Sequence, residues 1–204
     1  YKVLTHEDIQ VVVNAYAAGA RRAKQAGCDG VEIHGGHGYL LSSFLSPRTN
    51  KRTDEYGSST ENRSRFLVGE VRAVRAAVGP DFAMWVKLDS QEVGKEGGIT
   101  IEHAKVTAKL VEEAGADAIT VSAYHDTGIG KLHSASNIPH EPNALLPAGA
   151  AIKVVVGIPI ICSGRVEPEH GDAEIRAGRL DVLGMGRQLL ADPELPNKLA
   201  AGTA

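Results

Sequence analysis

Two histidines and a tyrosine lie within six residues of one another, directly after a short and mostly apolar segment. The residues are His34, His37 and Tyr39, and three glycines lie between them. Two imidazoles at this spacing can hold one anionic oxygen or one metal ion, and the adjacent phenol can give up a proton. Few structural roles require this combination at the end of a strand, so the segment is a candidate reaction site.

Composition and charge narrow the class of protein. The chain has 204 residues, which suits one domain with a buried core. A net charge of −3, 4% aromatic residues and the lack of a basic stripe argue against a nucleic-acid partner. No apolar run approaches the roughly 20 residues that span a bilayer, and no signal peptide is visible, so we expect a cytoplasmic protein without membrane association. The isolated Cys28 and Cys162 resemble small core residues of a reducing compartment.

Three segments of the chain repeat one pattern, at residues 26–33, 114–121 and 177–184. Each contains an Ala-Gly pair, a short turn with an aspartate, and then a mostly apolar run. Glycine suits the left-handed position just after a helix, and strands that are apolar on both faces suit a parallel sheet covered by helices. Each segment therefore predicts the end of a helix followed by a buried strand.

Helices and strands are predicted to alternate along the whole chain. Apolar stripes with capping residues predict helices that begin after Thr5 and Thr100, and another over 63–78. Pro168 suits the first position of a helix, and a short helix is expected near 193–200. Five strands alternating with helices indicate an α/β fold with a parallel sheet. The strands are expected at 30–33, 83–88, 118–121, 159–162 and 181–184.

Two architectures fit this order, an open doubly wound sheet and part of a (β/α)8 TIM barrel. The open sheet would carry a G-x-G-x-x-G fingerprint after its first strand, which does not occur in that context. A complete barrel needs eight units and typically about 250 residues, so five strands are too few. We therefore favour an incomplete TIM barrel.

Polar residues cluster where the expected strands end, and the catalytic residues of such barrels lie at the carboxyl ends of strands. Taken singly, each has an ordinary explanation, such as a solvated histidine, a surface lysine or an arginine bound to carbonyl groups. Five such ends in one sheet are harder to explain without a site. In chain order the ends carry His34, His37 and Tyr39; Lys87 to Ser90; Ser122 to Asp126; Ser163, Gly164 and Arg165; and Gly184, Gly186 and Arg187.

The last two strand ends have the composition of a phosphate site. Ser163-Gly164-Arg165 and Gly184-Met185-Gly186-Arg187 supply backbone N–H groups and two guanidinium groups. Loops after the final two strands of a barrel commonly hold phosphate, and arginine matches phosphate oxygens with two parallel hydrogen bonds. The two segments therefore predict a phosphorylated ligand or cofactor.

Longer motifs give the chain a family resemblance. They are Glu32-Ile33-His34-x-x-His37-Gly38-Tyr39-Leu40, the loop from Phe44 to Gly57, and Glu61-Asn62-Arg63-x-Arg65-Phe66. Together they resemble the old yellow enzyme family of FMN-dependent NAD(P)H oxidoreductases, from about Thr5 to the C-terminus. The resemblance implies an eight-stranded barrel of which residues 1–204 would form the C-terminal part, about strands 4–8, with strands 1–3 absent.

The resemblance also implies roles for individual residues. His34 and His37 would bind the carbonyl oxygen of a substrate, and Tyr39 would protonate its alkene carbon. Lys87 stands where many members carry an arginine against the flavin, and lysine keeps the charge without the planar fork. The matches to the segments that hold the FMN phosphate are Ser163, Gly164, Arg165, Gly186 and Arg187.

Two segments resemble particular branches of this family. Tyr124-His125-Asp126 resembles the 2,4-dienoyl-CoA reductase branch, in which the histidine assists protonation, so His125 is a further catalytic candidate. The tail at 191–198 resembles multidomain members, in which a 4Fe-4S cluster and an FAD domain follow. This sequence contains no cysteine cluster of that kind. Gly57-Ser58 departs from the usual Gly-Gly of the family, which slightly changes a loop turn.

The function expected from these features is an NADH- or NADPH-dependent reduction, through FMN, of the C=C bond of an α,β-unsaturated carbonyl compound. The substrate would be a small enone or enoyl molecule. Two alternatives stay open. His34, His37 and His125 could be the zinc ligands of a metal-dependent lyase or hydrolase. The chain could also be a non-catalytic barrel fragment, whose open sheet edges would pair with another chain or form a homo-oligomer.

Overall fold

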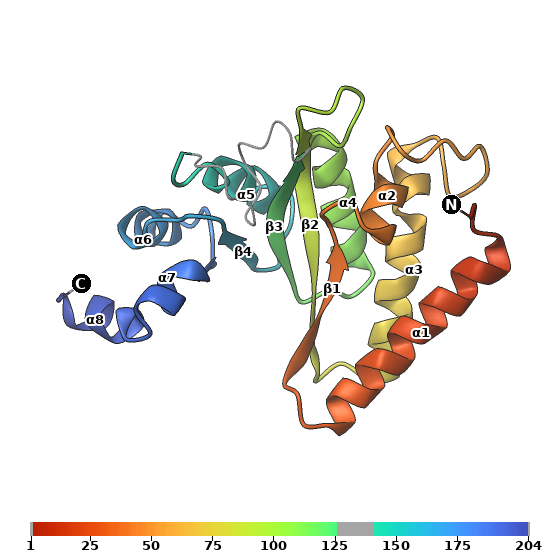
Figure 1. The fold of residues 1–204 in the computed structure, drawn as a ribbon. Helices are drawn as coiled ribbons and strands as arrows, with labels where there is room; N and C mark the ends of the chain where they lie inside the picture. Colours follow the sequence, from red (N-terminus) through yellow and green to blue (C-terminus); the bar gives the residue numbers. More distant parts are fainter. Residues whose placement is uncertain (1, 126–140, 204) are drawn as a thin grey trace.

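The computed structural model describes residues 2–125 and 141–203, apart from the side chain of His125. Its centre is a parallel sheet of five strands in the order β1-β2-β3-β4-β5, so each strand lies beside the next one in the chain (Figure 1). The predicted strands and their parallel direction are therefore confirmed. The strands are β1 (Gly30–Gly35), β2 (Ala83–Val93), β3 (Ala118–His125), β4 (Ile160–Ser163) and β5 (Val182–Gly184).

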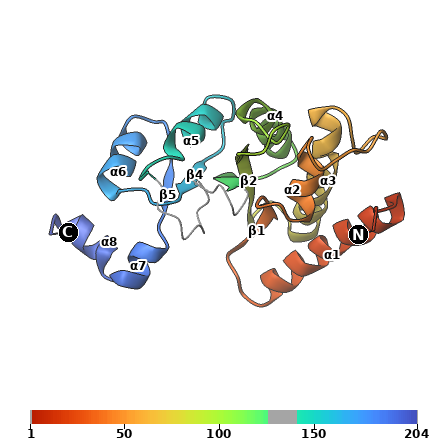
Figure 2. The same cartoon turned by 45° about the horizontal axis from the view of Figure 1, so that its top comes forward.

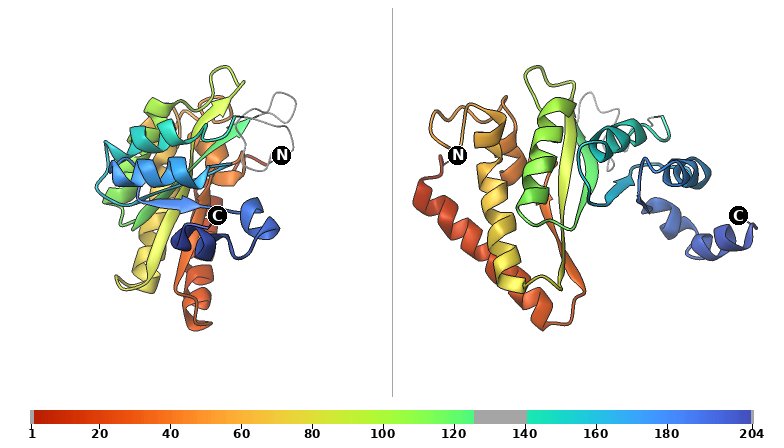
Figure 3. Two further views of the ribbon diagram at one scale, coloured as in Figure 1. Left: turned by 90° about the vertical axis from the view of Figure 1, so that its left-hand side faces the viewer. Right: turned by 180° about the vertical axis from the view of Figure 1, so that it is seen from behind.

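The helices that connect consecutive strands lie along one side of the sheet (Figure 2). The two chain ends lie on opposite sides of the molecule, as Figure 3 shows from behind. In the described strand order, β1 and β5 are the two edges of an open sheet. Within the described residues, no helix has both the length and the apolar character that crossing a membrane requires. The helices are α1 (His6–Gln25), α2 (Leu40–Leu45), α3 (Thr60–Val78), α4 (Ile101–Glu113), α5 (Leu146–Lys153), α6 (Pro168–Arg176), α7 (Arg187–Ala191) and α8 (Leu195–Ala201).

The long helices begin at hydroxyl residues that cap them. The Thr5 side chain accepts a hydrogen bond from the backbone N–H of Asp8, whose carboxylate accepts one from the N–H of Thr5 in return. Thr100 caps α4 in the same reciprocal way, so both predicted caps are confirmed. The helix predicted from residue 63 begins earlier, at Thr60, because Ser59 caps it.

The two faces of the sheet differ, which corrects the expectation of strands that are apolar on both faces. The face toward the helices is mostly apolar, and its side chains pack against α3, α4 and α5. The opposite face carries Glu32, His34, Lys87 and Thr120 in place of a second apolar layer. The buried strand residues on the helical side are Ile33, Met84, Val86, Leu88, Ile119, Val121, Ile160 and Cys162.

Three other features differ from the sequence expectations. The short α2, α5 and α7 were not predicted, and none of them has a side-chain cap that would mark its start. The strand expected over 83–88 runs on to Val93 as β2, with an irregularity in its pairing between Asp89 and Glu92. Cys28 is exposed in the turn before β1, whereas Cys162 is buried as expected.

One buried residue of α3 has an unusual environment. Glu70 is completely buried, and neither of its carboxyl oxygens has a hydrogen-bond partner. Phe66, Leu67 and Val71 of the same helix are buried as well. Burial raises the pKa of Glu70 from 4.5 to about 8, because the charged form would lose its hydration without gaining a partner. Glu70 therefore carries a proton at neutral pH.

Replacing Glu70 with glutamine should weaken the pH dependence of stability between about pH 5 and about pH 8. Because the folded-state pKa is raised, the stability that the neutral carboxyl contributes is fully present below 4.5 and is lost as the pH rises through about 8. Glutamine cannot ionise, so the free energy of unfolding of Glu70→Gln should fall less than that of the wild type between about pH 5 and about pH 8. Urea denaturation measures this, with Glu113→Gln on the surface of α4 as the control. Equal slopes for the wild type and Glu70→Gln would contradict the assignment.

Candidate active site

The candidate site begins on the face of the sheet that the outer helices leave open. Glu32 and His34 project from the same face of β1, because side chains alternate along a strand. His34 pairs in register with Lys87 of β2, and Lys87 pairs with Thr120 of β3. The register therefore places one carboxylate, one imidazole, one ammonium group and one hydroxyl on neighbouring strands.

The Glu32 carboxylate connects three strands. Its Oε1 accepts hydrogen bonds from Trp85 Nε1 at 2.8 Å and from Thr120 Oγ1 at 2.6 Å. Its Oε2 lies 3.0 Å from Lys87 Nζ. Burial raises the pKa of Glu32, but Thr120, Lys87 and Trp85 outweigh this effect, so the pKa lies below its usual value. Glu32 is therefore ionised at neutral pH and holds the Lys87 ammonium group in place.

His34 is held in its neutral form beside this ion pair. Burial lowers the pKa of His34, the Lys87 charge lowers it further, and the Glu32 charge opposes the shift. The Nδ1 atom of His34 is buried and has no hydrogen-bond partner. A neutral imidazole can donate one hydrogen bond and accept another, so His34 can bind a polar ligand atom without carrying a charge.

His37 follows in a tight turn after β1. His37 and Gly38 adopt φ angles of 62° and 72°, in the left-handed region that only glycine adopts without strain. The backbone N–H of His37 donates to Asp89 Oδ2 at 2.6 Å, and its ring Nε2 lies 2.7 Å from Ser122 Oγ. Both the backbone and the ring of His37 are thus held by residues of other strands.

The turn brings the three predicted rings together. The ring centroids of His34 and His37 are 4.9 Å apart, and those of His34 and Tyr39 are 5.6 Å apart. Tyr39 precedes α2, and 66% of its surface is exposed, so a ligand can reach its hydroxyl. Tyr124 of β3 packs on Gly38, where an added Cβ would lie 2.8 Å from its ring.

Two contributors to the site were not singled out from the sequence. Asp89 and Ser122 fell within segments noted at strand ends, but nothing marked them as partners of His37. Both are buried, and they pair in register between β2 and β3. A buried carboxyl and a buried hydroxyl on adjacent strands form a signal that becomes visible only once the register is known.

The predicted phosphate segments line one cavity of about 440 Å³ at the ends of β4 and β5. Gly164 and Arg165 adopt φ angles of 102° and 54°, which turns the chain sharply after β4. An added Cβ on Gly184 would lie 2.9 Å from the Cβ of Ser163, whereas one on Gly186 would meet no atom within 4 Å. The structure thus gathers all five predicted residues of this set, Ser163, Gly164, Arg165, Gly186 and Arg187, around open space.

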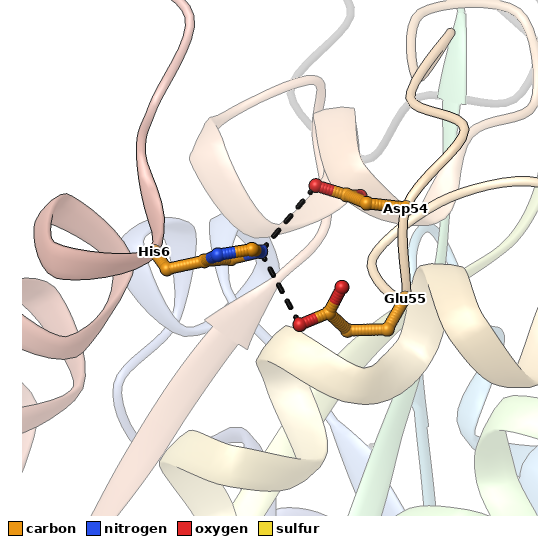
Figure 4. Close-up of side chains that lie close together, drawn as sticks. All are labelled: His6, Asp54 and Glu55. Atoms are coloured by element: carbon orange, nitrogen blue, oxygen red, sulfur yellow. Dashed lines mark ion pairs between the residues drawn. The ribbon is translucent and has the colours of Figure 1, made fainter.

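The zinc alternative required His34, His37 and His125, and the side chain of His125 lies outside the described residues. Among those that are described, one group of histidine and carboxylate side chains is close enough to share an ion. It comprises His6, Asp54 and Glu55 (Figure 4), with His6 Nε2 at 3.5 Å and 3.2 Å from the two carboxylates. Arg52 already pairs with Asp54 at 2.5 Å, and its charge would repel a cation there.

Comparison with known proteins shows the family of the chain. The model of the NADH:flavin oxidoreductase / NADH oxidase family matches residues 1–204. The chain belongs to this family. The family binds FMN, and its members named below are oxidoreductases, in agreement with the predicted class of cofactor.

Relatives among characterised proteins carry several activities. A metal reductase of Desulforamulus reducens is 42% identical over 201 residues, which cover 98% of this chain and 29% of the relative. A cinnamate reductase of Clostridium sporogenes is 38% identical over 209 residues, which cover 96% of this chain and 31% of the relative. The chain therefore spans less than one third of the length of either of these two proteins.

Solved structures agree with the fold. A 2-naphthoyl-CoA reductase in complex with 2-naphthoyl-CoA superposes with a TM-score of 0.87 at 33% identity, over 98% of this chain and 30% of that one. An old yellow enzyme homologue from Zymomonas mobilis superposes with a TM-score of 0.79 at 26% identity, over 100% of this chain and 55% of that one. The five-stranded parallel sheet is accordingly part of a (β/α)8 barrel of the old yellow enzyme type, as predicted.

The residues present fit FMN. The cavity beyond β4 and β5 combines two arginines with glycines whose missing side chains leave the backbone accessible, which suits a phosphate. Lys87, held by Glu32, places a positive charge on the same face of the sheet. The Nδ1 atom of His34 on this face is buried without a hydrogen-bond partner, which also indicates that a polar group binds here.

Two glycine substitutions test the packing of Tyr124 on Gly38. Gly38→Ala and Gly97→Ala both place a side chain at a positive φ, 72° and 69°, which lowers the free energy of unfolding by about 1 kcal/mol. At Gly97 an added Cβ meets no atom within 4 Å, so no further loss is expected there. Gly38→Ala should be destabilised by about 1 kcal/mol more, because the Tyr124 ring must move. Chemical denaturation of both variants measures the difference, and equal losses would contradict the packing described for Tyr124.

Proposed function

We propose that this chain forms the catalytic part of an FMN-dependent NAD(P)H oxidoreductase that reduces the C=C bond of an α,β-unsaturated carbonyl compound. One observation carries the proposal: the rings of His34, His37 and Tyr39 meet beside the fixed cation Lys87. Family membership supports the flavin, and the name of the cinnamate reductase supports an activated alkene as substrate. The chain would supply strands four to eight of the barrel, and other residues of the complete protein would supply the rest.

In this proposal His34 and His37 bind the carbonyl oxygen of the substrate. Hydrogen bonds from the two imidazoles would polarise the conjugated alkene and stabilise negative charge that develops on the oxygen during reduction. His34 suits this role because its lowered pKa keeps it neutral, so it offers a hydrogen bond without binding anions indiscriminately.

Tyr39 acts as the proton donor in this scheme. Its ring is exposed and lies 5.6 Å from the ring of His34, so a substrate whose oxygen bound to His34 would lie near Tyr39. Bound FMN would supply the hydride, taken from NADH or NADPH, to the carbon β to the carbonyl group. Tyr39 would then protonate the adjacent α carbon and recover its proton from solvent.

Binding of FMN would depend on two groups of residues. Lys87 would lie against the flavin ring, as the family resemblance implies, and Glu32 would fix its position. Ser163, Gly164 and Arg165 after β4, together with Gly186 and Arg187 after β5, would hold the phosphate. A 4Fe-4S cluster and an FAD domain, if the complete protein has them, would be held by other parts of that protein.

The role of Tyr39 can be tested with Tyr39→Phe. Loss of the proton donor should lower the rate of alkene reduction by at least about 100-fold, while reduction of the flavin by NADPH stays at the wild-type rate. Stopped-flow absorbance separates the two half-reactions. Tyr16→Phe, a change in α1 far from the three rings, should leave both rates unchanged. Alkene reduction by Tyr39→Phe at the wild-type rate would show that another group donates the proton.

The phosphate site can be tested with Arg187→Ala. Loss of a charged hydrogen-bond donor should weaken FMN binding by about 10- to 100-fold and leave riboflavin, which lacks the phosphate, bound as in the wild type. Quenching of flavin fluorescence on binding measures both affinities. Arg176→Ala on the exposed surface of α6 is the control, since the Arg176 side chain is largely exposed and pairs with Asp172 of the same helix. A parallel loss of FMN and riboflavin affinity would contradict a phosphate role for Arg187.

A further inference from the structure

Asp89 is a buried acid placed directly behind the turn that carries His37. Only 3% of its surface is exposed. Its Oδ2 accepts hydrogen bonds from the His37 backbone N–H at 2.6 Å and from Ser42 Oγ at 3.2 Å. Its Oδ1 is buried without a hydrogen-bond partner and lies 3.9 Å from His37 Nε2. One carboxyl oxygen thus holds the backbone of the turn, while the other faces the imidazole.

Two hydroxyl groups complete the support of this turn. Ser122 of β3 lies opposite Asp89 in register, and its Oγ is 2.7 Å from His37 Nε2. Ser42 of α2, which donates to Asp89, also accepts a hydrogen bond from the Gly38 N–H at 3.2 Å. Neither serine titrates, so among these three supporting side chains Asp89 is the one whose charge can change.

The other charged groups near Asp89 are already occupied. Glu92, further along β2, accepts hydrogen bonds from the Ile99 N–H at 2.9 Å and from Ser46. Lys95 lies 3.6 Å from Glu92 and 3.8 Å from the centroid of the Tyr124 ring, on β3. Burial raises the pKa of Asp89 from 3.8 to about 7, more than the bonds from His37 and Ser42 and the Lys95 charge lower it. Its charge therefore changes near neutral pH.

We propose that Asp89 is a positioning residue that makes the binding of anionic oxygen at His34 and His37 depend on pH, through the ionisation of its carboxyl group behind His37. This inference rests on the proposed function, which assigns the two imidazoles to the ligand oxygen. When the carboxyl is neutral, His37 stays oriented and no negative charge lies behind it. When the carboxyl loses its proton, a buried negative charge 3.9 Å from the imidazole opposes an anionic ligand, because burial leaves the repulsion largely unscreened.

The substitution Asp89→Asn separates this role from a purely structural one. The asparagine side-chain oxygen can still accept hydrogen bonds from the His37 N–H and from Ser42, so the turn keeps its support. The amide cannot ionise, so only the change of charge is lost. Ser122→Ala is the matched control, since it removes a contact to the same imidazole and removes no titrating group.

The experiment is calorimetric titration of the FMN-loaded, full-length protein with pentafluorophenol, which stays anionic from about pH 6 to about pH 9. Wild-type affinity should fall at least about tenfold over this range, and the affinity of Asp89→Asn should change less than about twofold. Ser122→Ala should bind more weakly at every pH and keep the wild-type fall. If Asp89→Asn falls in parallel with the wild type, the imidazole titrates alone and the role of Asp89 is wrong.

A second measurement on the wild type needs no variant. If the Asp89 carboxyl regains its proton when the anion binds, titration at about pH 8 in buffers with different heats of ionisation should show uptake of about one proton per ligand. Tight binding without proton uptake would overturn the inference and leave the oxygen site intact. A wild type that binds no phenolate at any pH would overturn the oxygen site itself, and with it the proposed function.

Discussion

The Glu32 carboxylate is the interaction on which the rest of the site depends. It accepts hydrogen bonds from Trp85 and Thr120 and pairs with Lys87, so it joins three adjacent strands on the open face of the sheet. It also fixes the ammonium group that, after burial, is the second cause of the lowered pKa of His34, although the Glu32 charge itself opposes that shift. A residue that tied the strands together without a charge would leave Lys87 unpaired at partial burial, which is unfavourable. The same carboxylate thus joins the strands and sets the charges of the site.

Two buried carboxyls show how location decides what such a group can do. Glu70 lies among apolar side chains of α3 without a partner, so its proton affects stability alone. Asp89 is buried within β2, where the strand pairing becomes irregular, with one oxygen on the His37 turn and the other facing an imidazole. The same physical effect, loss of hydration on burial, raises the pKa of both groups. Of the two, Asp89 is the one that contacts a proposed ligand-binding residue, so its change of charge can alter the affinity for a ligand.

The sequence predicts most of the fold and part of the site. The repeated Ala-Gly-Asp pattern predicts strands, and residues close together in the chain, such as His34, His37 and Tyr39, are recognisable as a group. Short elements such as α2 escaped because they have no capping residue. The supports of His37 escaped because they come from far along the chain, Asp89 52 residues and Ser122 85 residues away. Such partners follow from register, which local patterns do not specify.

The central claim is that this sheet face binds FMN, and one measurement tests it most directly. The full-length protein that contains these residues would be purified, its visible absorption spectrum recorded, and the material released by heat identified by mass spectrometry. The account predicts a flavin absorption band and about one FMN released per chain, because Arg165, Arg187 and Lys87 supply the charges that such a cofactor needs. A colourless full-length protein that neither releases nor takes up FMN would contradict it.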